Sequence, residues 1–190
     1  MRVKGTQTER NLITAFAGEA QARNRYTYFA GQARKDGFMQ IAGVFEETAE
    51  QEKEHGKRFF SLLEGGEAKV EAMFPAGKVG TTAENLKAAA DGEAYEWGRL
   101  YPDFAKTALA EGLDAAAKLF EFISVAEYFH ERRYRGLLAN VDAQAVFKKN
   151  ADVTWHCRNC GYTHQGKEAP QACPACAHPQ AYFELLVENW

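Results

Sequence analysis

The two halves of this chain repeat one pattern of glutamate and histidine residues. In the first half Glu19 precedes Glu52-x-x-His55, and in the second half Glu93 precedes Glu127-x-x-His130 at nearly the same interval. Each stands in a row of apolar residues spaced by three and four, which is typical of the buried face of an amphipathic helix. A buried carboxylate is costly without a counter-charge. The pattern therefore favours a fold in which four helices bring these side chains together around positive charge.

Residues that start and stop helices divide the chain before Ala151 into four segments. Thr6 with Glu9 and Thr81 with Glu84 have the spacing of capping boxes, in which a hydroxyl and a carboxylate satisfy free amides at a helix start. We expect helices from about Thr6 to Asp36, from Phe38 to Gly65, from Thr81 to Gly112 with a kink or a split at Pro102, and from Leu113 to Phe147. The second and third are joined by about fifteen residues, which suits a crossover better than a tight turn.

Metal ions are the natural counter-charge for these carboxylates. Five glutamates fall on the predicted inner faces: Glu19, Glu52, Glu93, Glu96 and Glu127. Few basic residues accompany them, and carboxylate oxygens with imidazole nitrogens suit iron or manganese. One Glu from each of two helices, with a Glu-x-x-His from each of the other two, is the ligand set of ferritin-like di-iron proteins. Glu96 lies one turn beyond Glu93, so it is either a further ligand or a surface acid. Tyr26 and Tyr101 hold core positions, from which buried hydroxyls could donate to the carboxylates.

The bulk composition is that of an ordinary water-soluble protein. Apolar residues make up 46% and charged residues 26% of the chain. No stretch reaches the roughly 18 apolar residues of a membrane span, and residues 1–10 lack the apolar core of a secretory signal, so we expect a cytoplasmic protein. A net charge of −3 without a basic cluster gives no footprint for nucleic acid.

The C-terminal segment from Ala151 to Trp190 contains all four cysteines, in two C-x-x-C pairs. The pairs are Cys157 with Cys160 and Cys173 with Cys176, and twelve residues separate the inner two. This spacing can close a tetrahedral thiolate cage for zinc or iron. A segment this short cannot build a sufficient core by itself, so a structural metal is expected. We predict short strands at residues 153–155 and 181–183, and two domains, a helical one over residues 1–150 and a cysteine domain over residues 151–190.

Together these motifs resemble the rubrerythrin family over essentially the whole chain. The resemblance implies a mainly α fold, namely a ferritin-like four-helix bundle with a long crossover, followed by a small β-rich rubredoxin-like domain. It implies two non-haem irons in the bundle and one iron on the four cysteines, where zinc is the alternative in a recombinant preparation. Glu52 and Glu127 would bridge the irons, Glu19 and Glu93 would be terminal ligands, and His130 would bind one iron. Glu96 and His55 would exchange as ligands to the other iron, with Tyr26 and Tyr101 beside the pair.

The resemblance also implies an activity and partners. The expected reaction is the reduction of hydrogen peroxide to water during oxidative stress, with electrons relayed through the chain's own rubredoxin-like site. No nicotinamide-binding fingerprint is present, so electrons from NADH would arrive through rubredoxin or a separate reductase. A head-to-tail homodimer is expected. Two alternatives stay open at this point: a ferroxidase or other iron-handling ferritin relative, and a zinc-ribbon interaction protein on an inert bundle.

Overall fold

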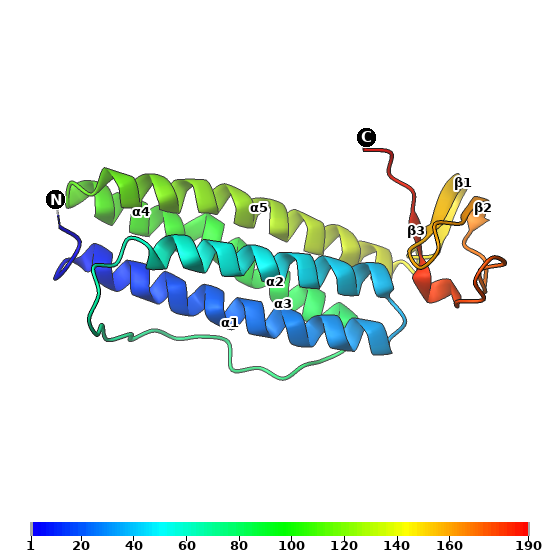
Figure 1. Cartoon of the computed structure of the whole chain (residues 1–190), viewed down its shortest axis with the longest axis horizontal. Coiled ribbons are helices and arrows are strands. Elements are labelled where there is room, and N and C mark those ends of the chain that lie inside the picture. The colour runs from blue at the N-terminus through cyan, green and yellow to red at the C-terminus, as the bar shows by residue number, and fades with distance from the viewer. Residues whose placement is uncertain (1, 190) are drawn as a thin grey trace.

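A computed structural model describes residues 2–189 and shows a long helical bundle with a small sheet at one end (Figure 1). The helices are α1 (Gln7–Lys35), α2 (Met39–Phe60), α3 (Thr82–Tyr95), the π-helical turn η1 (Glu96–Leu100), α4 (Tyr101–Ala110) and α5 (Asp114–Asp142). The sheet consists of β1 (Lys148–Cys157), β2 (Thr163–Glu168) and β3 (Phe183–Leu185), with the 3-10 turn η2 (Gln180–Tyr182) before β3. The predicted fold class, mainly α with a small β-rich end, is confirmed.

Two helical hairpins make up the bundle. Tight turns join α1 to α2 and α4 to α5, and an extended crossover of residues 61–81 runs along the outside of α1 to the start of α3 (Figure 1). The side chain of Gln21 on α1 ties this crossover down, because its Nε2 donates to the carbonyl of Pro75 at 2.9 Å. The crossover is longer than predicted, since α2 ends at Phe60 rather than near Gly65.

Two apolar layers of the helical core enclose the acidic residues between them, and a smaller cluster around Leu113 lies at the turn between α4 and α5. One layer gathers around Phe29, Phe45 and Leu86, and the other around Phe59 and Phe120. Burying aromatic rings of this size contributes roughly 2 kcal/mol each. The two layers also exclude water from the section of the bundle between them, which strengthens every electrostatic interaction there.

The third predicted helix is continuous past Pro102 and carries a π-turn directly before it. The amide of Tyr101 donates to the carbonyl of Glu96, five residues back. The carbonyl of Trp97 accepts instead from the Ser124 hydroxyl of α5 at 3.1 Å. Pro102 has no amide to lose and falls in the first turn of α4, where proline is tolerated. In place of the predicted kink or split, the structure has a local change of helical pitch just before Pro102.

The C-terminal sheet is antiparallel in the order β2-β1-β3 and packs around Trp155. The indole Nε1 donates to the carbonyl of Gly166 at 3.0 Å, so this fully buried ring leaves no polar group unpaired. The expected strand at residues 153–155 lies within β1, whereas of residues 181–183 only Phe183 is in a strand. The fourth helix also ends earlier than predicted, at Asp142.

The two hairpins are tied together by a pair of matching hydrogen-bond clusters. Asp36, which caps the end of α1, accepts from the amide and the hydroxyl of Thr82 at the start of α3. Glu111, which follows α4, accepts in the same way from the amide and the hydroxyl of Thr8 in the first turn of α1. Carboxylates at helix starts also complement the helix dipole. These clusters repeat the internal symmetry of the sequence at opposite ends of the bundle.

Replacing Thr82 by valine is expected to lower the free energy of unfolding by about 1–3 kcal/mol, because Thr82 is buried and Asp36 loses a charged hydrogen bond. Thermal or denaturant unfolding of the metal-loaded protein measures this. Thr27→Val is the matched control, since the Thr27 hydroxyl is exposed and bonds only within its own helix, to Arg23. Equal stability of the two variants would contradict the proposed tie.

Candidate metal centres

Two groups of ligand atoms lie side by side in the middle of the bundle. One group is Glu19, Glu52, His55 and Glu127, and the other is Glu52, Glu93, Glu127 and His130; within each, the ligand atoms lie within 4.8 Å of one another. Glu52 on α2 and Glu127 on α5 belong to both groups. A carboxylate shared by two such groups can bridge two metal ions, with one oxygen for each.

The surroundings of these carboxylates fit metal ions better than any other counter-charge. The four glutamates of the two groups are at most 1% exposed. Two of their oxygens, Oε2 of Glu19 and Oε2 of Glu93, have no hydrogen-bond partner among the described residues. Buried polar atoms are nearly always satisfied in proteins, so unpaired oxygens converging on one point indicate a binding site for cations.

The two histidines turn the same ring nitrogen toward the carboxylates. Nδ1 of His55 lies 2.9 Å from both Glu52 Oε2 and Glu127 Oε1. Nδ1 of His130 lies 2.7 Å from Glu127 Oε2 and 3.1 Å from Glu52 Oε1. At the outer edge, Nε2 of His130 lies 3.0 Å from Gln51 Oε1. Such an outer partner fixes the ring and leaves Nδ1 free to bind a metal.

The pKa values of these groups show the cost of the site without metal. Burial, followed by repulsion from Glu127 and Glu52, raises the pKa of Glu19 well above its ordinary value, and burial and the same two carboxylates do so for Glu93. Burial opposes the charging of His55, but its hydrogen bonds to Glu127 and Glu52 outweigh burial and raise its pKa to about 10. Protons thus occupy part of the site when cations do not.

Two tyrosines connect the hairpins across the site. The hydroxyl of Tyr26 on α1 donates to Glu93 on α3, and the hydroxyl of Tyr101 on α4 donates to Glu19 on α1. Both tyrosines are at most 1% exposed. Each therefore satisfies one oxygen of a glutamate on the neighbouring element, leaving the other oxygen free for a ligand bond.

Glu96 lies outside both ligand groups. It is the first residue of η1, and its Oε1 lies 3.9 Å from the point where a Cβ on Gly18 would be. Burial and then repulsion from Glu127 and Glu52 raise its pKa well above the ordinary value, whereas the charge of Arg25 lowers it. The structure thus places His55, and not Glu96, against Glu52 and Glu127, the two carboxylates that both groups share. Of the residues that contact the site, Gln51 was not predicted, because a polar residue beside a ligand has no distinguishing spacing.

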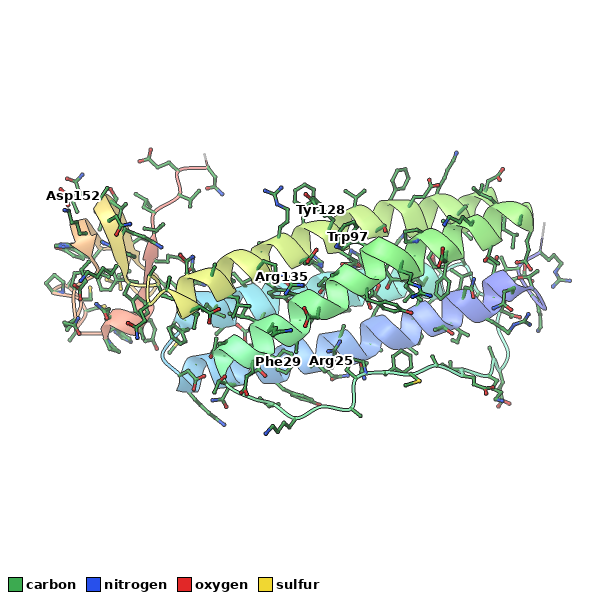
Figure 2. The ribbon with its side chains drawn as sticks, turned by 180° about the vertical axis from the view of Figure 1, so that it is seen from behind. Arg25, Phe29, Trp97, Tyr128, Arg135 and Asp152 are labelled. Carbon is green, nitrogen blue, oxygen red and sulfur yellow. The ribbon has the colours of Figure 1, made fainter. Side chains whose placement is uncertain are left out.

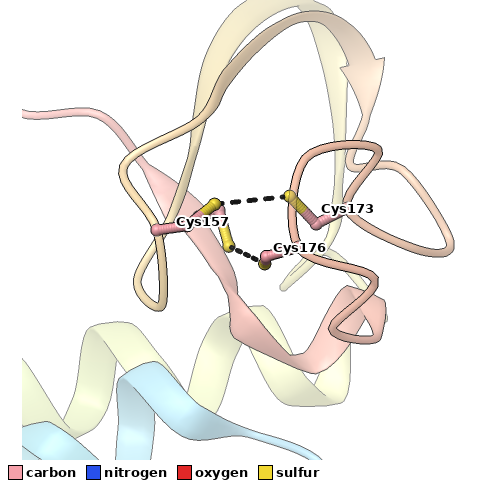
Figure 3. Close-up of side chains that lie close together, drawn as sticks. Cys157, Cys173 and Cys176 are labelled. Atoms are coloured by element: carbon pink, nitrogen blue, oxygen red, sulfur yellow. Dashed lines mark hydrogen bonds between the residues drawn. The ribbon is translucent and has the colours of Figure 1, made fainter.

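The four cysteine sulfurs lie at the corners of a compact cage (Figure 3). Cys157 Sγ is 3.8 Å from Cys176 Sγ, and Cys160 Sγ is 3.6 Å from Cys173 Sγ. A disulfide would require about 2.05 Å. A tetrahedron with metal–sulfur bonds of about 2.3 Å has edges of about 3.8 Å. The cage therefore has the dimensions of a tetrathiolate metal site.

Backbone amides stabilise this cage from outside. The amides of Tyr162 and His178 donate to the sulfurs of Cys160 and Cys176, each two residues after its cysteine. The hydrogen bond from His178 lowers the pKa of the Cys176 thiol to about 6. Gly161 has a φ of +80°, a backbone conformation that a residue with a side chain rarely adopts, and so permits the tight turn after Cys160. Thiolate, the metal-binding form, is thereby favoured at Cys176. At Cys160 the hydrogen bond from Tyr162 lowers the pKa, but burial and the hydrogen bonds with the other cysteines outweigh it and raise the pKa to about 12.

Comparison with known proteins identifies the same two parts. The rubrerythrin family model matches residues 10–138, and the model described as "Rubrerythrin, rubredoxin-like domain" matches residues 155–184. A rubrerythrin of Porphyromonas gingivalis is 58% identical over 188 residues, covering 99% of this chain and 94% of that one. A rubrerythrin of Nitratidesulfovibrio vulgaris is 54% identical, with coverage of 99% and 98%.

Solved structures show the same architecture. A mixed-valence structure of nigerythrin superimposes with a TM-score of 0.65 at 32% identity, covering 97% of this chain and 92% of that one. A bacterioferritin of Mycobacterium tuberculosis, at 20% identity and a TM-score of 0.64, covers 75% of this chain and shares its fold. The predicted ferritin-like bundle is thereby confirmed.

Fold and ligand sets together define a carboxylate di-iron helical protein with an appended tetrathiolate domain. The chain belongs to the rubrerythrin family. This family carries a di-iron site and a four-cysteine rubredoxin-like site, and the carboxylate, histidine and cysteine clusters described above supply both here. Its members are oxidoreductases. The family expected from the sequence is confirmed.

Proposed function

We propose that this protein is a peroxidase that reduces hydrogen peroxide to water. The observation that carries this proposal is the pair of four-ligand groups sharing Glu52 and Glu127. Two adjacent ferrous ions held there would supply the two electrons that cleavage of the peroxide O–O bond requires. Glu52 and Glu127 would bridge, Glu19 and Glu93 would be terminal ligands, and His130 would bind one iron.

The remaining groups of the site would hold the metal ligands in place and allow one ligand to be exchanged for another. His55 occupies the inner position and Glu96 the outer one. An exchange of these two residues would alter the charge at one iron, because a carboxylate is anionic and an imidazole is neutral. The hydroxyls of Tyr26 and Tyr101 would hold the terminal glutamates in place. Keeping these groups rigid and dry lowers the reorganisation that each redox step requires.

Electrons would enter through the cysteine cage, and geometry favours a homodimer for this transfer. The C-terminal domain that holds the cage lies beyond the end of the bundle at which α2 begins, at Met39 (Figure 1). Glu52 is thirteen residues along α2 from Met39, which is about 20 Å at the helical rise. Electron tunnelling slows steeply with distance. In a head-to-tail dimer the cage of one protomer would lie beside the di-iron site of its partner.

An apolar face of α5 offers a surface for such a dimer. Phe122, Val125 and Phe129 on this helix are each more than half exposed. Tyr128 lies beside them and packs edge-on against Trp97 (Figure 2). Exposed apolar patches of this kind usually mark interfaces.

Rubredoxin or an NADH-linked reductase would supply electrons to the cage. We place the protein in the cytoplasm, whose reducing conditions keep such cysteines available for metal; within residues 2–189, no helix is long and apolar enough to cross a membrane.

A peroxidase assay with a supplied reductase and NADH tests the proposal. We expect hydrogen peroxide to be consumed with one equivalent of NADH oxidised. The rival is a ferroxidase, favoured by the bacterioferritin-like fold. Faster ferrous oxidation by oxygen than by peroxide, with accumulation of a ferric mineral, would support the rival. Metal analysis and the visible spectrum distinguish iron in the cysteine cage from zinc, since only the ferric tetrathiolate is coloured.

Replacing both Cys157 and Cys160 by serine is expected to remove one of about three irons per chain and to reduce steady-state peroxide consumption at least tenfold. The di-iron site lies in the bundle, so a single turnover of chemically reduced variant should keep the wild-type rate. Gln165→Ala, an exposed change in β2, is the control. Unchanged steady-state turnover in the cysteine variant would exclude the relay.

A further inference from the structure

A cavity of about 300 Å³ lies between the bundle and the crossover, next to the di-iron ligands. Helix α1 forms its floor, the end of α3 with η1 and the first residue of α4 form one wall, and the crossover forms its roof. Its lining includes Gly18, Arg25, Phe74, Pro75, Glu96 and Leu100. The bond from Gln21 to the Pro75 carbonyl holds the roof in place. None of the roles proposed above uses this space.

The missing side chain of Gly18 leaves part of this space open. A Cβ built there would lie 3.7 Å from Phe74 Cε1 and 3.9 Å from Glu96 Oε1, which are ordinary contact distances. The position could therefore hold alanine without a clash, and a longer side chain would project between Phe74 and Glu96. A single helical glycine thus separates an apolar wall of the cavity from its acidic one.

The inner end of the cavity is polar and adjoins the metal ligands. Glu96 lines it, and so does Tyr101, whose hydroxyl donates to Glu19. Arg25 lies between α1 and α3 (Figure 2), within 3.9 Å of a Cβ position on Gly92. Its Nε is buried and has no hydrogen-bond partner among the described residues. A donor is therefore free at the polar end, beside a carboxylate that stands at the edge of the ligand groups.

The cavity is much larger than hydrogen peroxide needs. A water molecule takes up about 30 Å³ in the liquid, and hydrogen peroxide has only one more heavy atom than water. A cavity of this volume, mostly apolar with a few polar groups at one end, has the properties of a site for a small organic molecule. The apolar residues Phe74, Pro75 and Leu100 would contact its hydrocarbon part.

We propose that this cavity binds compact organic hydroperoxides, R–O–OH, with the hydrocarbon group under Phe74 and Pro75 and the hydroperoxide group toward Glu96. This proposal rests on the peroxidase function proposed above and extends it to a second substrate class. The O–O bond breaks, two electrons come from the reduced iron pair, and two protons complete one alcohol, R–OH, and one water. The reduced donor protein then restores the two electrons.

The test compares cumene hydroperoxide with hydrogen peroxide in the iron-loaded protein and in cavity-filling variants. We expect Gly18→Leu to lower the ratio of kcat/KM for cumene hydroperoxide to kcat/KM for hydrogen peroxide at least tenfold. Gly31→Leu is the matched control, because Gly31 lies on the same helix with open space around its Cβ position. If Gly18→Leu impairs folding, Gly18→Ala is measured instead. Alanine fits at this position without a clash and should lower the ratio at least twofold.

A binding measurement separates this proposal from the proposed function. In calorimetric titration, cumyl alcohol, the product, should bind both the oxidised iron-loaded wild-type protein and the Gly31→Leu variant. It should bind the Gly18→Leu variant at least tenfold more weakly. Equal ratios and equal binding in the two leucine variants would overturn the cavity proposal, as would wild-type protein that reduces hydrogen peroxide but not cumene hydroperoxide. If neither peroxide is reduced while cumyl alcohol binds as expected, the peroxidase function fails and the binding site stands.

Discussion

Protein carrying Glu52→Gln is expected to retain about one iron per chain and to lose peroxide reduction by more than about 100-fold. Glu52 belongs to both ligand groups, so one change affects both metal positions. A neutral amide of the same size cannot offer an anionic oxygen to each of two cations. Replacing groups that merely support metal ligands already costs 10–100-fold. Metal analysis and the peroxidase assay measure the result, and the iron that remains should be that of the cysteine cage.

The matched control for this change is Glu54→Gln on the same helix. Glu54 is exposed and pairs with Lys57. Its replacement should leave the iron content and the activity unchanged. If Glu52→Gln retained about three irons per chain, the assignment of Glu52 as a bridging ligand would be wrong.

Removing the bundle irons is expected to lower the melting temperature by about 10 °C at pH 8. A metal present at a thousand times its dissociation constant stabilises the folded state by about 4 kcal/mol. For a chain of this length, each kcal/mol shifts the melting temperature by about 2–4 °C. Reduction and chelation of the protein, followed by thermal unfolding, tests this expectation.

The effect of metal removal should grow as the pH rises. In the metal-free protein, burial and mutual repulsion raise the pKa of Glu19, Glu93 and Glu96. A raised pKa means that stability falls as the pH rises above the unfolded value near 4.5. For His55 and His130, hydrogen bonds to Glu127 and Glu52 overcome the opposing effect of burial and raise the pKa to about 10 and about 9. The contribution of these two histidines to the stability of the metal-free protein is complete below their unfolded pKa of about 6.5. It is lost as the pH rises through their folded pKa values.

One carboxylate acts in the opposite direction. Burial raises the pKa of Glu52, but its hydrogen bonds from His130 and His55 lower it overall, so its contribution is present above the unfolded value and is lost in acid. Between pH 6 and 9 the glutamates and histidines with raised pKa values dominate the pH dependence of stability. Metal binding also strengthens over this range, because the ligands lose their protons. Melting curves of both forms at pH 6, 7.5 and 9 should diverge. A difference in melting temperature that stayed constant across these pH values would contradict the expected pH dependence.

The pattern of ligands could be predicted because it is local. Helical periodicity alone places Glu52 and His55 on one face, and two C-x-x-C pairs can close a cage whatever surrounds them. The π-turn was missed, although the two halves contain a signal for it. Tyr26 follows Glu19 by seven residues, whereas Tyr101 follows Glu93 by eight. The wider turn absorbs this extra residue and returns Tyr101 to the inner face.

The amino-acid sequence by itself determined which side chains face the core, which metals suit them and which family they define. Those properties depend on residue type and on spacing within single helices. Only the tertiary structure decided that Tyr26 donates to Glu93 across the bundle, that His55 rather than Glu96 faces Glu52 and Glu127, and that the crossover roofs a cavity over Gly18. These relations join elements far apart in the chain. Their geometry follows from how the helices and the crossover pack, and no local spacing encodes that packing.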